Sequence, residues 1–273
     1  MTTTAKLALH TWTLDTTPLA DVLPIVKAAG WGAVELRRLD FTRAAERGET
    51  ADQVISMVKA SGLPVACVGV ELGWIWARGD ERVRLQKVFD EQCARARALG
   101  ATTVMSPVDR GRGDLGDAAT SVREVGDIAA GHGVKLALEF NSQCEQLNTL
   151  AGIRELMARA AHPRCGLLLD TYHLERSGAD LRAIEDVTPP EIAYVQYSDV
   201  PRTGLEPGKV LDRLPPGRGR VRFTEVFGVI AKKGYAGYLS YEAPNPSEWA
   251  RPAGDVARDA LAATLAVLPG SSS

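Results

Sequence analysis

Four short apolar stretches in the second half of the chain each end on a side chain that carries an oxygen ligand: Glu139, Asp170, Gln196 and Glu242. A carboxylate beside apolar residues is costly to desolvate unless it is paired or bound to a cation. Three carboxylates that converge without a counter-charge would repel each other, and at least one would stay protonated. A divalent cation resolves this conflict, and oxygen ligands favour a hard ion. We therefore expect one bound divalent ion: Mn²⁺, Mg²⁺ or Co²⁺.

Each of these residues also has an ordinary explanation. A single Asp or Glu at a strand end is more often a helix N-cap or a salt-bridge partner, and Gln196 alone is explained equally well as a solvated amide. Four such residues at four successive strand ends favour metal ligation over four separate explanations. His173 follows Asp170 by three residues, and it either contacts substrate or orients Asp170.

Eight short apolar segments are expected to position these side chains. They are rich in Val, Leu, Ile and Tyr, and their continuous apolar character is typical of parallel strands buried on both faces. Segments with helical spacing separate them, and many end in a glycine that suits a helix C-cap. The predicted strands are 6–12, 33–36, 65–70, 102–107, 134–140, 166–170, 192–199 and 237–242. The predicted helices are 18–29, 50–61, 80–99, 117–131, 147–160, 222–233 and 254–267, with a weaker one at 178–186.

About eight strand–helix units in 273 residues predict an α/β fold, a single-domain (β/α)8 TIM barrel. A doubly wound sheet also alternates strands and helices. The number of units favours the barrel, and so does the lack of a GxGxxG fingerprint after the first strand. We expect the barrel to span residues 1–268 and residues 269–273 to form a disordered tail.

The active site of such a barrel lies at the C-terminal ends of its strands. Polar and aromatic residues near these ends are therefore candidate substrate contacts, and an arginine there is suited to an anionic group, with ordinary surface charge as the alternative. His132 and His162 lie in helix-end turns, and we expect both outside the site. The candidate substrate contacts are His10, Trp12, Glu35, Ser106, Arg202 and Arg213.

Composition indicates a cytoplasmic enzyme with a small-molecule substrate. The net charge of −2 gives no electrostatic reason to expect nucleic acid. No run of about 18 apolar residues indicates a membrane span, and the first residues lack a signal-peptide layout. The four scattered cysteines form neither a CxxC zinc pair nor a disulfide scaffold. The protein is a possible homo-oligomer, although no sequence feature determines its oligomeric state.

The order LALEF, LLLDTYH, YVQYSDVP, LPPGRGRVRFTEVF and KKGYAGYLSYE resembles the xylose-isomerase-like TIM-barrel superfamily. It is most similar to the group of sugar phosphate isomerases and epimerases, hydroxypyruvate isomerases and inosose dehydratases, and the resemblance covers nearly the whole chain. In that family, residues from strands 5 to 8 hold one divalent metal in the order Glu, Asp, His or Gln, Glu. The resemblance thus places Glu139, Asp170, Gln196 and Glu242 as the metal ligands.

The resemblance also implies a reaction. It implies a metal-dependent isomerase or epimerase acting on a keto-sugar or related polyhydroxy ketone, with Glu139 and Glu242 moving the α-proton through a metal-stabilised enediolate. His173 matches a family position that contacts a substrate oxygen. Two alternatives remain: a dehydratase (lyase) of the inosose or 3-dehydroshikimate type, and a non-catalytic sugar-binding barrel.

Two branches of the superfamily fit this sequence less well. The dehydroshikimate dehydratases usually carry further Arg and His residues in the loop after strand 7, where this chain has Arg202 and Arg213 but no His. The DNA-repair endonucleases bind a metal cluster through several histidines, whereas this chain has only four His and a near-neutral charge.

Overall fold

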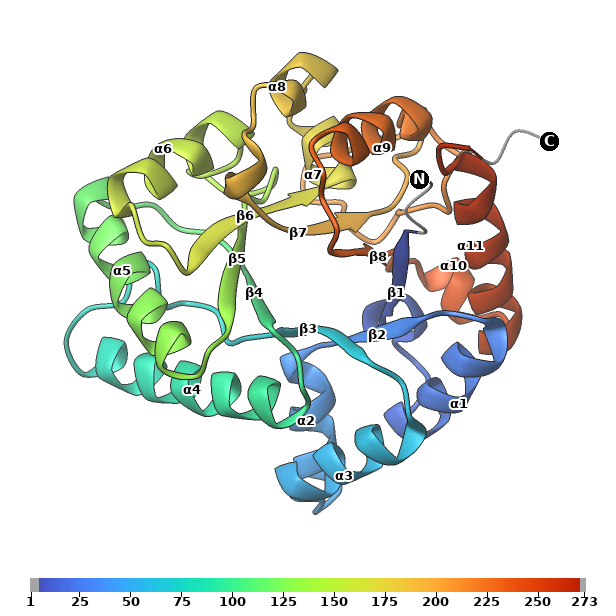
Figure 1. Cartoon of the computed structure of the whole chain (residues 1–273), viewed down its shortest axis with the longest axis horizontal. Coiled ribbons are helices and arrows are strands. Elements are labelled where there is room, and N and C mark those ends of the chain that lie inside the picture. Colours follow the sequence, from blue (N-terminus) through green and yellow to red (C-terminus); the bar gives the residue numbers. More distant parts are fainter. Residues whose placement is uncertain (1–4, 271–273) are drawn as a thin grey trace.

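The strands form one closed parallel barrel in chain order, which confirms the predicted (β/α)8 fold (Figure 1). The computed structural model describes residues 5–270. Each strand pairs with the next, and β1 pairs with β8 to close the barrel. All eight predicted strands are present, as β1 (Lys6–His10), β2 (Ala33–Leu36), β3 (Val65–Gly69), β4 (Thr103–Pro107), β5 (Lys135–Glu139), β6 (Cys165–Asp170), β7 (Ile192–Tyr197) and β8 (Tyr238–Tyr241).

Helices surround the barrel (Figure 1). The predicted helices occur as α1 (Leu19–Ala29), α3 (Ala51–Ser61), α4 (Gly79–Ala98), α5 (Leu115–Gly131), α6 (Leu150–Ala160), α8 (Leu181–Glu185), α9 (Phe223–Lys232) and α11 (Ala253–Val267). Short segments missing from the prediction are α2 (Arg38–Glu46), α7 (Thr171–Arg176), α10 (Pro246–Trp249) and the 3₁₀ helices η1 (Thr11–Leu14) and η2 (Pro189–Glu191). These segments are too short or too polar to show a clear apolar periodicity.

The described part of the chain has two apolar cores. The larger one fills the space between the strands and the helices. The smaller one draws residues from seven strands and fills the barrel interior; its members are Ala8, Ala33, Ala66, Cys67, Met105, Ala137, Leu168 and Tyr194. Because alternate residues of a strand face the same side of a sheet, the residues two positions further along also face inward. These are the strand-end residues His10, Glu35, Pro107, Glu139, Asp170 and Gln196.

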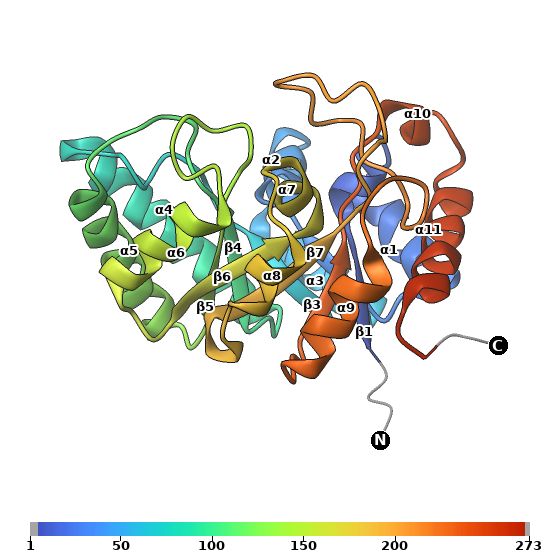
Figure 2. The same cartoon turned by 90° about the horizontal axis from the view of Figure 1, so that it is seen from above.

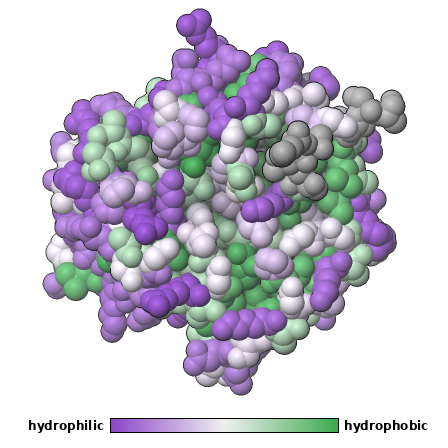
Figure 3. Space-filling model, viewed as in Figure 1, coloured by the Kyte–Doolittle hydropathy of each residue, from purple (hydrophilic) through white to green (hydrophobic). Residues whose placement is uncertain are grey.

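The outer surface follows the helical pattern. In Figure 3, hydrophilic residues gather on the outer helices, while apolar residues show nearer the middle of this face. Among residues 5–270, no helix is long and apolar enough to cross a membrane. The helix α11 ends at Val267. Of the predicted tail 269–273, residues 271–273 lie outside the described part of the chain, as do residues 1–4.

Candidate active site

A pocket of about 580 Å³ opens where the strands end. The long connection between β7 and α9 (orange) projects from this end of the barrel (Figure 2). Six of the candidate residues line the pocket: His10, Trp12, Glu139, His173, Arg213 and Glu242. The position of the pocket agrees with the general rule for barrels of this kind.

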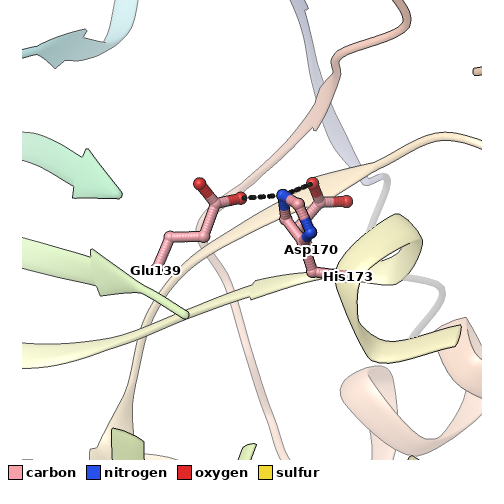
Figure 4. A group of neighbouring side chains, drawn as sticks. All are labelled: Glu139, Asp170 and His173. Atoms are coloured by element: carbon pink, nitrogen blue, oxygen red, sulfur yellow. Dashed lines mark ion pairs between the residues drawn. The ribbon is translucent and has the colours of Figure 1, made fainter. Parts of the chain in front are cut away.

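Three carboxylates meet at the pocket base around one arginine. The Nη1 atom of Arg213 donates to Asp170 Oδ2 at 2.7 Å and to Glu242 Oε2 at 2.8 Å. Glu139 points toward His173, whose Nε2 atom lies 3.8 Å from Glu139 Oε1 and 3.9 Å from Asp170 Oδ2 (Figure 4). Candidate ligand atoms of Glu139, Asp170 and His173 all lie within 4.8 Å of one another. The structure therefore brings three of the predicted acids together and adds His173 to the group.

Gln196 lies beside Asp170, its register partner on the neighbouring strand. Gln196 Nε2 donates to Glu35 Oε1 at 2.8 Å. The other amide atom, Gln196 Oε1, is buried and has no hydrogen-bond partner among the described residues, and the same is true of Glu139 Oε1. Buried polar atoms are nearly always bonded. Two unpartnered oxygens beside buried carboxylates form a donor set that fits a hard divalent cation.

The charges at the site are only partly balanced. Burial raises the pKa of Glu139 well above its usual value, and the charges of Asp170 and Glu242 raise it further. Burial raises the pKa of Glu242 to about 7 against the opposing charge of Arg213. Burial acts in the same direction on Asp170, but Arg213 and then His173 outweigh it and lower its pKa. One guanidinium therefore faces three acids, and a second positive charge would be needed to balance them when all three are ionised.

His10 is a buried, neutral group beside these acids. Burial lowers its pKa well below the usual value, and the charges of Arg37 and Arg213 lower it further. The Trp12 backbone N–H donates to His10 Nδ1 at 3.1 Å, so the ring proton lies on Nε2. That Nε2 is 3.4 Å from Glu242 Oε1. His10 thus lies next to Glu242 without adding a charge.

His173 lies on the other side of the pocket base. Burial lowers its pKa to about 3, so the ring is neutral near pH 7. Its Nδ1 atom lies 3.0 Å from Ser142 Oγ. Its Nε2 atom lies 3.4 Å from Arg213 Nη2. His173 lies on α7, and its Nε2 atom thus faces the carboxylates of Glu139 and Asp170.

The loop after β7 brings Arg213 into the barrel. Asp199 and Leu214 form an isolated antiparallel bridge, which fixes the backbone next to Arg213. The Asp199 carboxylate accepts backbone N–H groups from both ends of the loop, including Gly219. A Cβ atom at Gly219 would collide with the Val200 carbonyl oxygen, which explains the second glycine of the PPGRG stretch.

Aromatic packing completes the placement of Arg213. Its guanidinium lies 4.4 Å from the centre of the Tyr172 ring. Tyr172 donates its own hydroxyl to Asp212 Oδ1 at 2.7 Å. Arg213 is only 3% exposed, so it is part of the pocket base and not a surface charge.

Three predicted substrate contacts do not line the pocket. Ser106 faces outward from the barrel, because its neighbours Met105 and Pro107 take the inward positions, and it accepts the Trp74 indole N–H at 3.1 Å. Arg202 is exposed in the loop after β7. Glu35 faces inward, but it is fully buried beside Gln196 and Tyr194.

The two remaining histidines lie away from the site. His132 is paired with Asp90 at 2.7 Å, and His162 with Asp127 at 3.1 Å. Neither lines the pocket, in agreement with their expected positions at helix ends.

Sequence reasoning missed several polar residues of the pocket. They come within a few residues of a strand end, in segments that show no periodicity of their own, so closeness to a strand end is the only signal that points to them. They are Arg37, Arg38, Asp109, Arg110, Asn141 and Gln143.

Residues 23–266 match the family described as xylose isomerase-like TIM barrel, and the chain belongs to this family. The predicted resemblance is therefore confirmed. A 3-dehydroshikimate dehydratase from Pseudomonas putida is 28% identical over 258 residues, which are 90% of this chain and 39% of that protein. An inosose isomerase from Halalkalibacterium halodurans is 27% identical over 147 residues, 53% of this chain and 52% of that protein.

The chain thus spans less than two thirds of the length of either relative. Among solved structures, the IolI protein with a bound zinc atom has a TM-score of 0.84 at 19% identity, and the match covers 96% of this chain and 98% of that one. At this level of identity the likeness supports the fold alone.

Proposed function

We propose that the protein is a divalent-metal-dependent isomerase or epimerase that removes the proton next to the carbonyl of a keto-sugar or related polyhydroxy ketone. One observation carries the proposal: buried acids converge at the barrel mouth, and within residues 5–270 one oxygen each of Glu139 and Gln196 lacks a hydrogen-bond partner. The proposed metal ligands are Glu139, Asp170, Gln196 and Glu242. A bound Mn²⁺, Mg²⁺ or Co²⁺ would polarise the substrate carbonyl and balance the negative charge.

The side chains of the pocket divide the remaining work. Glu139 on β5 and Glu242 beyond β8 approach the pocket from different strands and form the proposed acid–base pair. A general base works best when its pKa lies near the working pH; burial raises the pKa of Glu242 to about 7 and raises that of Glu139 well above its usual value. His10 orients Glu242, and His173 contacts a substrate oxygen with its Nε2 atom.

Dehydration is the second candidate function. The relative that matches 90% of this chain is a 3-dehydroshikimate dehydratase. Arg37, Arg38 and Arg110 line the pocket, and arginines there suit a substrate that carries a carboxylate. The first step, removal of an α-proton, is common to both candidates. The outcomes differ in whether the proton returns or a β-hydroxyl leaves.

Solvent deuterium exchange followed by NMR tests the proposal. The metal-loaded protein is incubated in D₂O with ketoses, hydroxypyruvate, inososes and 3-dehydroshikimate, and the metal-stripped protein is the control. We expect deuterium at the α-carbon of at least one substrate, and only with metal. Label without loss of water supports an isomerase or epimerase, and an unsaturated product supports a dehydratase. Binding without any exchange would instead indicate a sugar-binding barrel.

A further inference from the structure

Glu35 is a buried acid that the proposed chemistry does not use. It is fully buried at the end of β2 and does not line the pocket. Its Oε1 atom accepts Gln196 Nε2 at 2.8 Å, and its Oε2 atom accepts the Tyr194 hydroxyl at 3.0 Å. Its closest cationic candidate is the neutral His10, with Nε2 3.8 Å away. Glu35 is therefore held by neutral donors and not by an ion pair.

The amide of Gln196 has two ends of nearly equal shape and opposite chemistry. Its oxygen can bind a cation, and its NH₂ group can only donate hydrogen bonds. Which end faces the site is decided by the partner of the other end. The Glu35 carboxyl group accepts the NH₂ end, which leaves Oε1 as the end without a partner among the described residues. An apolar residue at position 35 would remove this preference.

We infer that Glu35 is a positioning residue that fixes the Gln196 amide so that its oxygen, and not its NH₂ group, is presented to the cation. Tyr194 in turn holds Glu35 through its second oxygen. This inference rests on the metal site of the proposed function. Glu35 on β2 would thus support a proposed metal ligand on β7 that lies 161 residues further along the chain.

Direct titration with Mn²⁺, followed by the EPR signal of the free ion, measures the effect without any substrate. Glu35→Met should lower the affinity for Mn²⁺ by about 10- to 100-fold, as expected for the loss of a group that orients a ligand. Tyr194→Phe disturbs the same buried cluster but keeps the acceptor of Gln196, and it should change the affinity by less than about threefold. Thermal melting of each metal-free variant shows whether it folds. If Glu35→Met does not fold, Glu35→Leu replaces it in the same titration.

Repeating Glu35→Met in a protein that already carries Gln196→Ala separates two effects of Glu35: orientation of the Gln196 amide, and the charge of Glu35 itself. If Glu35 acts through the Gln196 amide, Glu35→Met causes no further loss of affinity when Gln196 is already Ala. Gln196→Glu should restore binding to Glu35→Met, because a carboxylate offers an oxygen at either end. Equal losses from Glu35→Met in both backgrounds, or unchanged affinity in the folded single variant, would overturn this inference alone. Absence of Mn²⁺ binding by the wild-type protein would overturn the metal site together with it.

Discussion

Replacement of Glu139 by glutamine is expected to reduce α-proton exchange by about 10²–10⁴-fold, the usual contribution of a general base. Glutamine keeps the shape and one oxygen but cannot accept the proton. The rate of deuterium incorporation at saturating metal measures the effect. Glu242→Gln should cause a loss in the same range, because the two glutamates act on the same proton in the proposed scheme.

Glu145→Gln is a matched control for this result. Glu145 lies on the connection after β5, is exposed, and pairs with Arg112 at 2.9 Å outside the pocket. Its replacement should leave exchange unchanged. If Glu139→Gln keeps its metal and exchanges within tenfold of the wild-type rate, Glu139 is not the base and the proposed acid–base pair is wrong.

Replacement of Arg213 by methionine is expected to destabilise the metal-free protein by about 3–5 kcal/mol, the cost of removing one partner of a buried ion pair. Arg213 is the cation that directly bonds Asp170 and Glu242. Without it, no other Lys or Arg among residues 5–270 forms an ion pair with these acids or with Glu139, and the more distant Arg37 compensates only part of the charge of Glu242. Chemical denaturation near neutral pH, with all divalent ions chelated, measures the loss.

Added Mn²⁺ should restore much of this stability, because a ligand that binds only the folded state stabilises it by about 2.7 kcal/mol at 100 times its Kd. Arg202→Met is the matched control: it removes an exposed arginine from the same loop and should leave stability unchanged. Equal stability of metal-free Arg213→Met and wild-type protein would show that the acids are neutral or solvated, contrary to the electrostatic account of the site.

The barrel was predictable because its strands carry continuous apolar runs and its main helices carry a regular apolar stripe. The positions of Glu139 and Asp170 followed from the same runs, since each acid is the last residue of its strand. The helix α7 was not predictable, because only six residues separate Asp170 from the next turn. The outward side chain of Ser106 depends on strand phase, where a shift of one residue reverses the direction.

Other features of the site depend on contacts between distant segments. Arg213 reaches the acids only because Asp199 ties the two ends of its loop together and Tyr172 packs under its guanidinium. The bond between Glu35 and Gln196 joins the second strand to the seventh. No local pattern reports such pairings, so the sequence indicated Glu35 and Arg213 as strand-end and loop residues but not what they contact.

The most direct measurement is a crystal structure of the protein grown with Mn²⁺, with diffraction data collected at the manganese absorption edge. The account predicts one anomalous peak that lies roughly 2.1 Å, a distance typical of small hard divalent ions, from one oxygen of each proposed ligand: Glu139, Asp170, Gln196 and Glu242. It also predicts that Arg213 no longer bonds the oxygens of Asp170 and Glu242. A peak held by Glu139, Asp170 and His173 without Gln196, or no peak at the barrel mouth, would contradict it.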